Sequence, residues 1–190
     1  MRVIAGFLRG RRLAPVKGRI RPTAAKVREA IFNILGDAVL KGRVLDLFAG
    51  TGALGIEALS RGAKEAVFVE EHPEALKVLR RNLEDLGLLA QAAVLPIPVV
   101  TALKKLAVRR ERFSLAFLDP PYGGGVAAGV LAALAAADLL SPRAWVVAEH
   151  SRRESLPESC GSLARQGLRR YGDTQVAFYV NDQSEIQEQV

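Results

Sequence analysis

The sequence predicts a single α/β domain built around a doubly wound, mostly parallel β-sheet. Its 190 residues suit one domain. Hydrophobic residues make up 49% of the chain, which is enough to bury a sizeable core. From residue 43 onwards, apolar strand patterns alternate with amphipathic helical patterns. Such an alternation is typical of a parallel sheet that is covered by helices on both faces.

The alternation comprises five strands and four intervening helices. The strands are expected at residues 44–48, 66–70, 92–95, 114–118 and 144–150, and the helices at 53–61, 73–86, 99–108 and 126–140. Two more strands, 163–171 and 175–180, flank the turn Gly172-Asp173-Thr174 and predict an antiparallel hairpin that closes the sheet edge. The expected sheet therefore has seven strands, and a polar tail follows at residues 181–190.

Residues 1–36 form a basic extension that differs from the catalytic body expected at 37–180. Residues 1–30 hold nine Lys and Arg side chains and one acid, Glu29, which gives this segment a charge of +8. Since the whole chain has a net charge of +7, the remaining residues sum to −1. We expect a mobile arm with a short hairpin of strands 3–5 and 12–14, followed by a helix over 24–35. A cationic segment on a near-neutral body predicts a polyanionic partner, and nucleic acid is the polyanion we expect.

Candidate phosphate contacts come from both parts of this extension, because its cations lie among glycines or at the start of the helix. They are Arg9, Arg11, Arg12, Lys17 and Arg19 in the arm, and Arg21, Thr23, Lys26 and Arg28 near the mouth of the expected site.

Cysteine usage and hydropathy indicate a cytoplasmic protein. A single cysteine, Cys160, excludes an internal disulfide and a cysteine metal cluster. The N-terminus lacks the apolar region of a secretory signal. The longest apolar run, 126–140, is interrupted by Asp138 and is shorter than the roughly 20 residues of a membrane span. We therefore expect no membrane partner and no metal, and a monomer.

A glycine-rich turn follows the first strand of the body. The segment Asp46-Leu-Phe-Ala-Gly50-Thr-Gly52-Ala-Leu-Gly55 ends a strand and opens a helix, which brings a ligand close to backbone N–H groups. Glu70 lies at the end of the next strand, where a carboxylate can bind ribose hydroxyls. The spacing also fits a dinucleotide. The Asp46 carboxylate suits a cationic amino-acid ligand better than a pyrophosphate, which favours S-adenosylmethionine over NAD.

A second motif, Asp119-Pro120-Pro121-Tyr122, follows the strand 114–118. The two prolines stiffen the backbone and stop a regular ladder, so they hold the carboxylate and the ring in place. If Asp119 and the Pro120 carbonyl each accept an N–H from an exocyclic amino group, the lone pair of that group is directed toward an electrophile. The Tyr122 ring can stack on the base. The motif therefore predicts methylation of a base amino group.

In this order, the two motifs and Glu70 resemble class I S-adenosylmethionine-dependent amino methyltransferases. The N-terminal segments Met1-Arg-Val-Ile-Ala-Gly, Arg9-Gly-Arg-Arg-Leu and Arg21-Pro-Thr, together with Tyr171-Gly-Asp-Thr, resemble the RsmD family of bacterial 16S rRNA guanine-N2 methyltransferases over roughly residues 1–180.

The resemblance implies methyl transfer from S-adenosylmethionine, with no metal, to N2 of guanine 966 in the 30S particle or an assembly intermediate. It implies cofactor contacts from Asp46, Gly50, Gly52, Glu70, Ile97 and Asp119, and catalytic roles for the residues of the second motif: Asp119, Pro120, Pro121 and Tyr122. The chain departs from the family after the third strand, where Pro96 and Pro98 stand in place of a side chain that binds adenine. Adenine recognition would then depend on carbonyl groups and apolar contacts near Ile97 and Val99.

Three other functions stay open. A nicotinamide-dependent oxidoreductase would explain the glycine spacing and leave the second motif unexplained. A DNA adenine-N6 methyltransferase shares that motif, and the basic extension suits DNA as well as RNA. A non-catalytic RNA-binding assembly factor is favoured only by the Pro96-Ile97-Pro98 departure.

Overall fold

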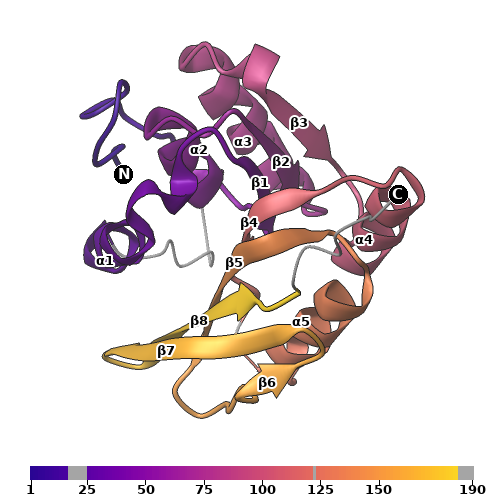
Figure 1. Ribbon diagram of the computed structural model, residues 1–190. Helices are drawn as coiled ribbons and strands as arrows, with labels where there is room; N and C mark the ends of the chain where they lie inside the picture. Colours follow the sequence, from indigo (N-terminus) through magenta and orange to yellow (C-terminus); the bar gives the residue numbers. More distant parts are fainter. Residues whose placement is uncertain (17–24, 122, 184–190) are drawn as a thin grey trace.

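The computed structural model describes residues 1–16, 25–121 and 123–183 and contains one eight-stranded sheet. Its strand order is β3-β2-β1-β4-β5-β8-β7-β6 (Figure 1). The strands are β1 Arg43–Leu47, β2 Glu65–Val69, β3 Ala92–Leu95, β4 Phe113–Leu118, β5 Leu140–Ser151, β6 Ser159–Cys160, β7 Leu163–Tyr171 and β8 Thr174–Asn181. Strands β1 to β5 are parallel, and β8 and β7 continue the sheet antiparallel, so the predicted fold class is confirmed.

Helices cover both faces of the sheet. The described helices are α1 Ala25–Leu35, α2 Ala53–Ser60, α3 Pro73–Asp85, α4 Val99–Val108 and α5 Val126–Ala136, with short 3-10 turns at Gly36–Val39 and Leu89–Gln91. One core lies between the sheet and α1, α2 and α3, and the other lies between the sheet and α4 and α5. Alternate residues of each strand enter opposite cores, as Val44 and Leu45 do in β1, because side chains alternate along a strand.

The C-terminal part differs from the prediction in three details. The helix that starts at Val126 ends at Ala136 and not at residue 140, because Asp138 turns the chain with φ 48°. Leu140 then begins β5 and pairs with Phe113. The hairpin does not form the edge itself: β8 lies between β5 and β7, and the short β6 pairs with the outer side of β7.

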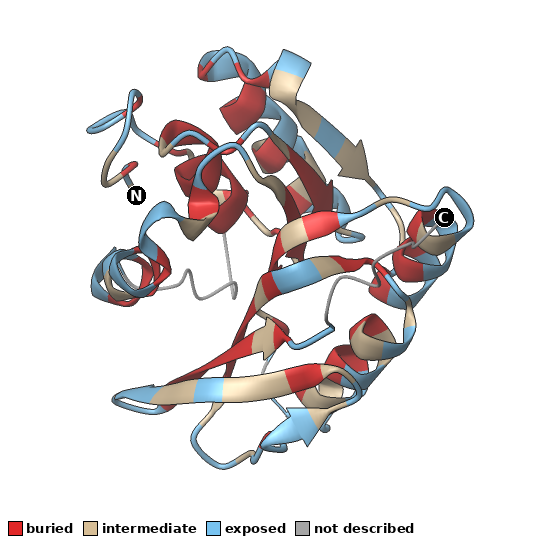
Figure 2. Ribbon diagram, viewed as in Figure 1, coloured by how far each residue is buried: buried red, intermediate tan, exposed pale blue. Residues whose placement is uncertain are grey.

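The N-terminal arm is docked on the body, which corrects the expectation of a mobile segment up to residue 16. Val3, Leu8 and Leu13 are buried in the core that also contains α2 and α3. The hairpin is shorter than predicted and has one antiparallel bridge, between Arg2 and Arg12. Because the arm covers the outer side of α2, every residue of that helix from Leu54 to Ser60 is buried (Figure 2).

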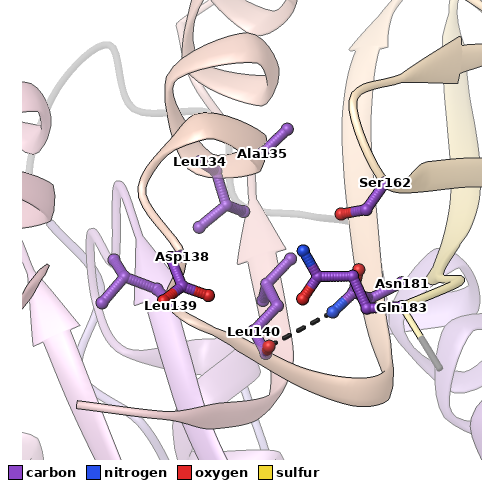
Figure 3. Close-up of a pocket in the computed structure, with 8 residues that line it drawn as sticks. All are labelled: Leu134, Ala135, Asp138, Leu139, Leu140, Ser162, Asn181 and Gln183. Carbon is purple, nitrogen blue, oxygen red and sulfur yellow. Dashed lines mark hydrogen bonds between the residues drawn. The ribbon is translucent and has the colours of Figure 1, made fainter. Parts of the chain in front are cut away.

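A small hollow lies between α5, the start of β5 and the end of β8 (Figure 3). The Asn181 Nδ2 group donates hydrogen bonds to the carbonyl oxygens of Leu140 (3.2 Å) and Ser141 (2.9 Å), which joins the two strands there. The hollow measures about 10 Å³, which is room for one water molecule at most. It is therefore a packing feature and no substrate site.

Candidate active site

A cleft of about 890 Å³ opens at the carboxyl ends of β1, β2, β4 and β5. The strand order reverses between β1 and β4, and ligands of open α/β sheets bind at such a switch point. The cleft brings together most of the predicted site residues of the described chain, and its lining includes Asp46, Gly50, Glu70, Ile97, Asp119, Pro120 and Pro121. Tyr122 lies outside the described residues.

Glu70 shapes the glycine-rich loop. Its Oε2 accepts a hydrogen bond from the Gly50 N–H (2.8 Å), and its Oε1 accepts one from the His72 N–H (2.8 Å). Gly50 has φ 55°, a conformation that glycine adopts without strain. A carboxylate has about four acceptor positions, so Glu70 can hold the loop and also receive ligand hydroxyls.

Asp46 is 1% exposed and lies behind the loop. Its Oδ2 accepts a hydrogen bond from the Gly55 N–H (2.9 Å) in the first turn of α2. Burial raises the pKa of Asp46 to about 7, and the neighbouring Glu70 charge also raises it, while the bond from Gly55 lowers it. A cationic ligand group in the cleft would offset the cost of ionising this carboxyl.

Two of the glycines serve packing. Gly52 has φ 80°, and a Cβ there would lie 2.5 Å from the Leu79 side chain; a Cβ at Gly55 would lie 2.3 Å from the Phe68 ring. Gly52 is not among the residues that line the cleft, and its N–H donates to the Ala49 carbonyl (2.7 Å). A direct cofactor contact at Gly52 stays a prediction.

The wall after β3 is apolar, as the two prolines predict. Ile97 and Val99 line the cleft, and the Ile97 N–H already donates to the Leu95 carbonyl (3.0 Å). Pro96 and Pro98 have no N–H to donate. A ring against this wall therefore meets apolar side chains, with no N–H offered by residues 96–98.

Several lining residues had no site role in the sequence reasoning, among them Phe48, Glu149, Tyr171 and Thr174. Glu149 is buried and follows Ala148, which pairs with Leu118 in the neighbouring strand β4. Glu149 therefore stands beside Asp119 at the same edge of the sheet. The sequence offered only a partial signal, an acid near the end of the fifth predicted strand, because consecutive parallel strands need not be neighbours and the pairing of β5 with β4 comes from the structure.

Of the nine predicted RNA-binding residues, five lie in the described part of the chain. Arg9, Arg11, Arg12 and Lys26 are exposed, while Lys17, Arg19, Arg21 and Thr23 lie outside the described residues. Arg28 does not fit the predicted RNA-binding set, because its side chain is fully buried. Its guanidinium donates to the Arg2 carbonyl (2.6 Å) and lies 3.7 Å from the Glu57 carboxylate. Arg28 therefore holds the arm to the body and offers no free charge to RNA.

The lining fits S-adenosylmethionine better than a nicotinamide dinucleotide. Carboxyl groups stand at the ends of β1, β2, β4 and β5, and no Lys or Arg is among the described residues of the lining. A pyrophosphate would face Asp46 and Glu70 without a counter-charge, whereas an ammonium or sulfonium group would be attracted to them. In the described chain, no cluster of three or more His, Cys, Asp or Glu residues could hold a metal ion.

No helix within the described ranges is long and apolar enough to cross a membrane.

The strand order and the cleft at the switch point define a class I methyltransferase fold. A Thermus hypothetical protein, TTHA0928, has this fold with a TM-score of 0.82 and 34% identity, covering 94% of this chain and 98% of that chain. A Salinibacter ruber RNA methyltransferase solved with S-adenosyl-L-homocysteine is more distant, with a TM-score of 0.65 and 18% identity, covering 88% of this chain and 98% of that chain.

Residues 1–180 match the model of the family described as "Conserved hypothetical protein 95". The chain is 42% identical over 180 residues to the Bacillus subtilis protein named "Putative rRNA methyltransferase YlbH", covering 94% of this chain and 98% of the relative. It is 33% identical over 157 residues to Ribosomal RNA small subunit methyltransferase D of Haemophilus influenzae, covering 82% and 81%. The chain belongs to this family, and the predicted resemblance to RsmD is confirmed.

Proposed function

We propose that this protein transfers a methyl group from S-adenosylmethionine to N2 of a guanine in small-subunit rRNA, guanine 966 of the 30S particle or its precursor. The observation that carries the proposal is one cleft lined by both the glycine-rich loop and Asp119-Pro-Pro. Two relatives named as rRNA methyltransferases support the RNA substrate. We also propose that the enzyme acts in the cytoplasm, where this substrate is assembled, and that it is a monomer.

The chemistry needs a base amino group to become a nucleophile. The bound cofactor supplies an electrophilic methyl group. Asp119 accepts one N2–H of the guanine and the Pro120 carbonyl accepts the other, which holds the nitrogen lone pair in line with that methyl group. As the N–C bond forms and the S–C bond breaks, the nitrogen loses one proton, which Asp119 accepts. Pro121 stiffens the turn, and Tyr122 stacks on the base.

Glu149 favours guanine over adenine as the base. The Watson–Crick edge of guanine carries two adjacent donor positions, N1–H and N2–H, whereas adenine offers an acceptor at N1 beside its amino group. With Asp119 on the amino group, a neighbouring carboxylate would accept N1–H from guanine and repel N1 of adenine. The position of Glu149 beside Asp119 therefore supports N2-guanine methylation against the N6-adenine alternative.

The basic N-terminal extension would hold the RNA. We propose that residues 1–36 bind phosphates and residues 37–180 bind the cofactor and the base, with the contacts at Arg9, Arg11, Arg12, Lys17, Arg19, Arg21, Thr23 and Lys26. The exposed members of this set in the described chain are Arg9, Arg11, Arg12 and Lys26.

The catalytic proposal is tested with Asp119→Ala. We expect methyl transfer to unmodified 30S particles to fall by about a thousandfold or more, because both the orienting hydrogen bond and the proton acceptor are lost. Binding of S-adenosylhomocysteine, measured by calorimetry, should change by less than about fivefold, a change of the size of one hydrogen bond. Near-normal turnover of this variant would refute the assigned mechanism, and failure of the wild-type protein to bind S-adenosylhomocysteine would favour the oxidoreductase or assembly-factor alternatives.

The proposed recognition of guanine N1–H by Glu149 is tested with Glu149→Gln. The substrate is RNA that carries 2-aminopurine in place of the target guanine, because this base keeps the amino group and lacks N1–H. The wild-type enzyme should lose about tenfold in kcat/KM on the analogue, whereas Glu149→Gln, whose amide can donate to N1, should lose less than about threefold between the two substrates. Equal losses in both proteins would show that Glu149 does not contact N1.

A further inference from the structure

Asn82, in the last turn of α3, binds two segments that lie far from it in the sequence. Its side chain is 2% exposed. The Oδ1 atom accepts a hydrogen bond from the Ala14 N–H at the end of the N-terminal arm (2.7 Å). The Nδ2 group donates to the Thr51 carbonyl in the glycine-rich loop (2.9 Å) and to the Ala14 carbonyl (3.3 Å). One buried amide therefore joins the arm to the cofactor loop.

The loop side of this link bears on the cleft. Thr51 lies between Gly50 and Gly52, whose φ angles are 55° and 80°. Glu70 fixes the Gly50 N–H from one side, and Asn82 fixes the Thr51 carbonyl from the other. Glycine-flanked peptide groups reorient at little steric cost, so these two side chains decide which way the loop N–H groups point.

The arm side of the link is equally specific. The tip of the arm has its own attachments, because Ser60 accepts the Leu8 N–H (3.0 Å) and donates to the Ala5 carbonyl (2.5 Å). Among the side chains of the described residues that bind the arm, Asn82 is the one that also binds the glycine-rich loop. The next residues after Ala14, Pro15 and Val16, line the cleft.

We infer that Asn82 is a positioning residue that couples the docking of the arm to the conformation of the cofactor loop, so that RNA and cofactor bind cooperatively. This inference rests on the proposed function, which places RNA on the arm and the cofactor on the loop. RNA that binds the docked arm favours the docked state, and through Asn82 that state favours the ordered loop. The cofactor must then strengthen RNA binding by the same factor.

The test measures binding of radiolabelled S-adenosylhomocysteine by equilibrium dialysis, alone and with unmethylated 30S particles. In the wild-type protein the particles should tighten S-adenosylhomocysteine binding by about fivefold or more, the lower end of typical coupling between two sites. Asn82→Asp keeps the acceptor for Ala14 and loses the donor to Thr51. It should bind S-adenosylhomocysteine alone about fivefold more weakly and show no effect of the particles. Asn82→Ala should behave in the same way.

Two further variants separate coupling from general damage. Ala14→Pro removes the shorter of the two hydrogen bonds between Ala14 and Asn82 (2.7 Å) and keeps the longer one to the Ala14 carbonyl (3.3 Å). It should therefore reduce the effect of the particles to less than about twofold, with S-adenosylhomocysteine binding alone retained within about twofold. Ser60→Ala loosens only the arm tip and should retain the coupling. Unchanged coupling in Ala14→Pro, or wild-type binding in both Asn82 variants, would overturn the inference. A wild-type protein that binds the cofactor product without any effect of the particles would also overturn it and leave the proposed function intact. Failure to bind either ligand would refute the proposed function itself.

Discussion

At the scale of single residues, Asp46 shows that the site is built at a cost in stability. Its carboxyl is buried beside the Glu70 charge, and its pKa is raised from 3.8 to about 7. Between these two values the folded protein holds a proton that the unfolded chain has already released. The free energy of unfolding therefore falls as the pH rises through this window, and the full cost is present above about pH 7. A cationic ligand needs the ionised form and would recover part of that cost.

Asp46→Asn should therefore separate stability from binding. At about pH 8 the variant should melt at a higher temperature than the wild-type protein, and near pH 4 the difference should vanish, because Asp46 is then protonated in the folded state. Its affinity for S-adenosylmethionine should fall by about tenfold or more with the loss of the charge. Wild-type affinity should also drop as the pH falls below about 7, and the variant should lack this dependence. Calorimetry and thermal melts at several pH values check both statements, and a pH-dependent affinity in the variant would contradict this role.

At the scale of elements, the arm, α1 and α2 form one unit around the Glu57 carboxylate. Glu57 is 1% exposed and accepts the N–H groups of Ile4 (2.8 Å) and Ala5 (3.0 Å). Arg28 from α1 and Arg61 at the end of α2 supply the positive charges. Burial lowers the pKa of Arg28, and the Glu57 charge offsets part of this effect. Loss of either partner would therefore leave the other as a poorly compensated buried charge.

Arg28 and Lys26 provide a matched pair of substitutions on the same helix. Arg28→Ala leaves the buried Glu57 with less compensation and should cost about 3 kcal/mol of unfolding free energy in urea denaturation. Lys26→Ala, at an exposed position, should change it by less than about 0.5 kcal/mol and should weaken RNA binding instead. If the Arg28→Ala protein were as stable as wild type and bound RNA more weakly, Arg28 would be an RNA contact and would not hold the arm to the body.

The limits of prediction follow from the range of the interactions. The glycine loop, Glu70 and Asp119 were predictable because each depends on a strand end and the few residues after it. The docking of the arm was not, because it depends on Glu57 and Asn82, which lie more than fifty residues away from their partners Ile4 and Ala14. Arg28 looked like its exposed neighbours for the same reason. The spacing of Val3, Leu8 and Leu13 was the one local sign of a buried arm face.

At the scale of the whole molecule, the charge asymmetry agrees with the proposed division between RNA binding by the arm and chemistry in the cleft. Residues 1–30 carry +8, while the rest of the chain sums to −1 and contains the acidic cleft. Arg9, Arg11 and Arg12 are exposed on the docked arm and are therefore presented on a fixed surface. Because an acidic cleft repels phosphates, we propose that a base that has left the stack enters it while the arm holds the RNA backbone.

The triple substitution of Arg9, Arg11 and Arg12 by Ala tests this division. It should weaken binding of the RNA particle and reduce the slope of log affinity against log salt by about two to three, because each lost phosphate contact removes slightly less than one unit. Affinity for S-adenosylhomocysteine in the absence of RNA should stay within about twofold of wild type. Filter binding across a salt series checks the slope, and an unchanged slope would remove the arm from the RNA interface.

The central claim is that the cleft methylates guanine N2 in assembled small-subunit rRNA. The most direct measurement is transfer of a tritiated methyl group to unmodified 30S particles, naked 16S rRNA and DNA, followed by nucleoside analysis of each product. The account predicts N2-methylguanosine from the particles, with Asp119→Ala as the inactive control and little or no label in DNA. N6-methyladenosine from DNA, or no methylated nucleoside from any of the three substrates, would contradict it.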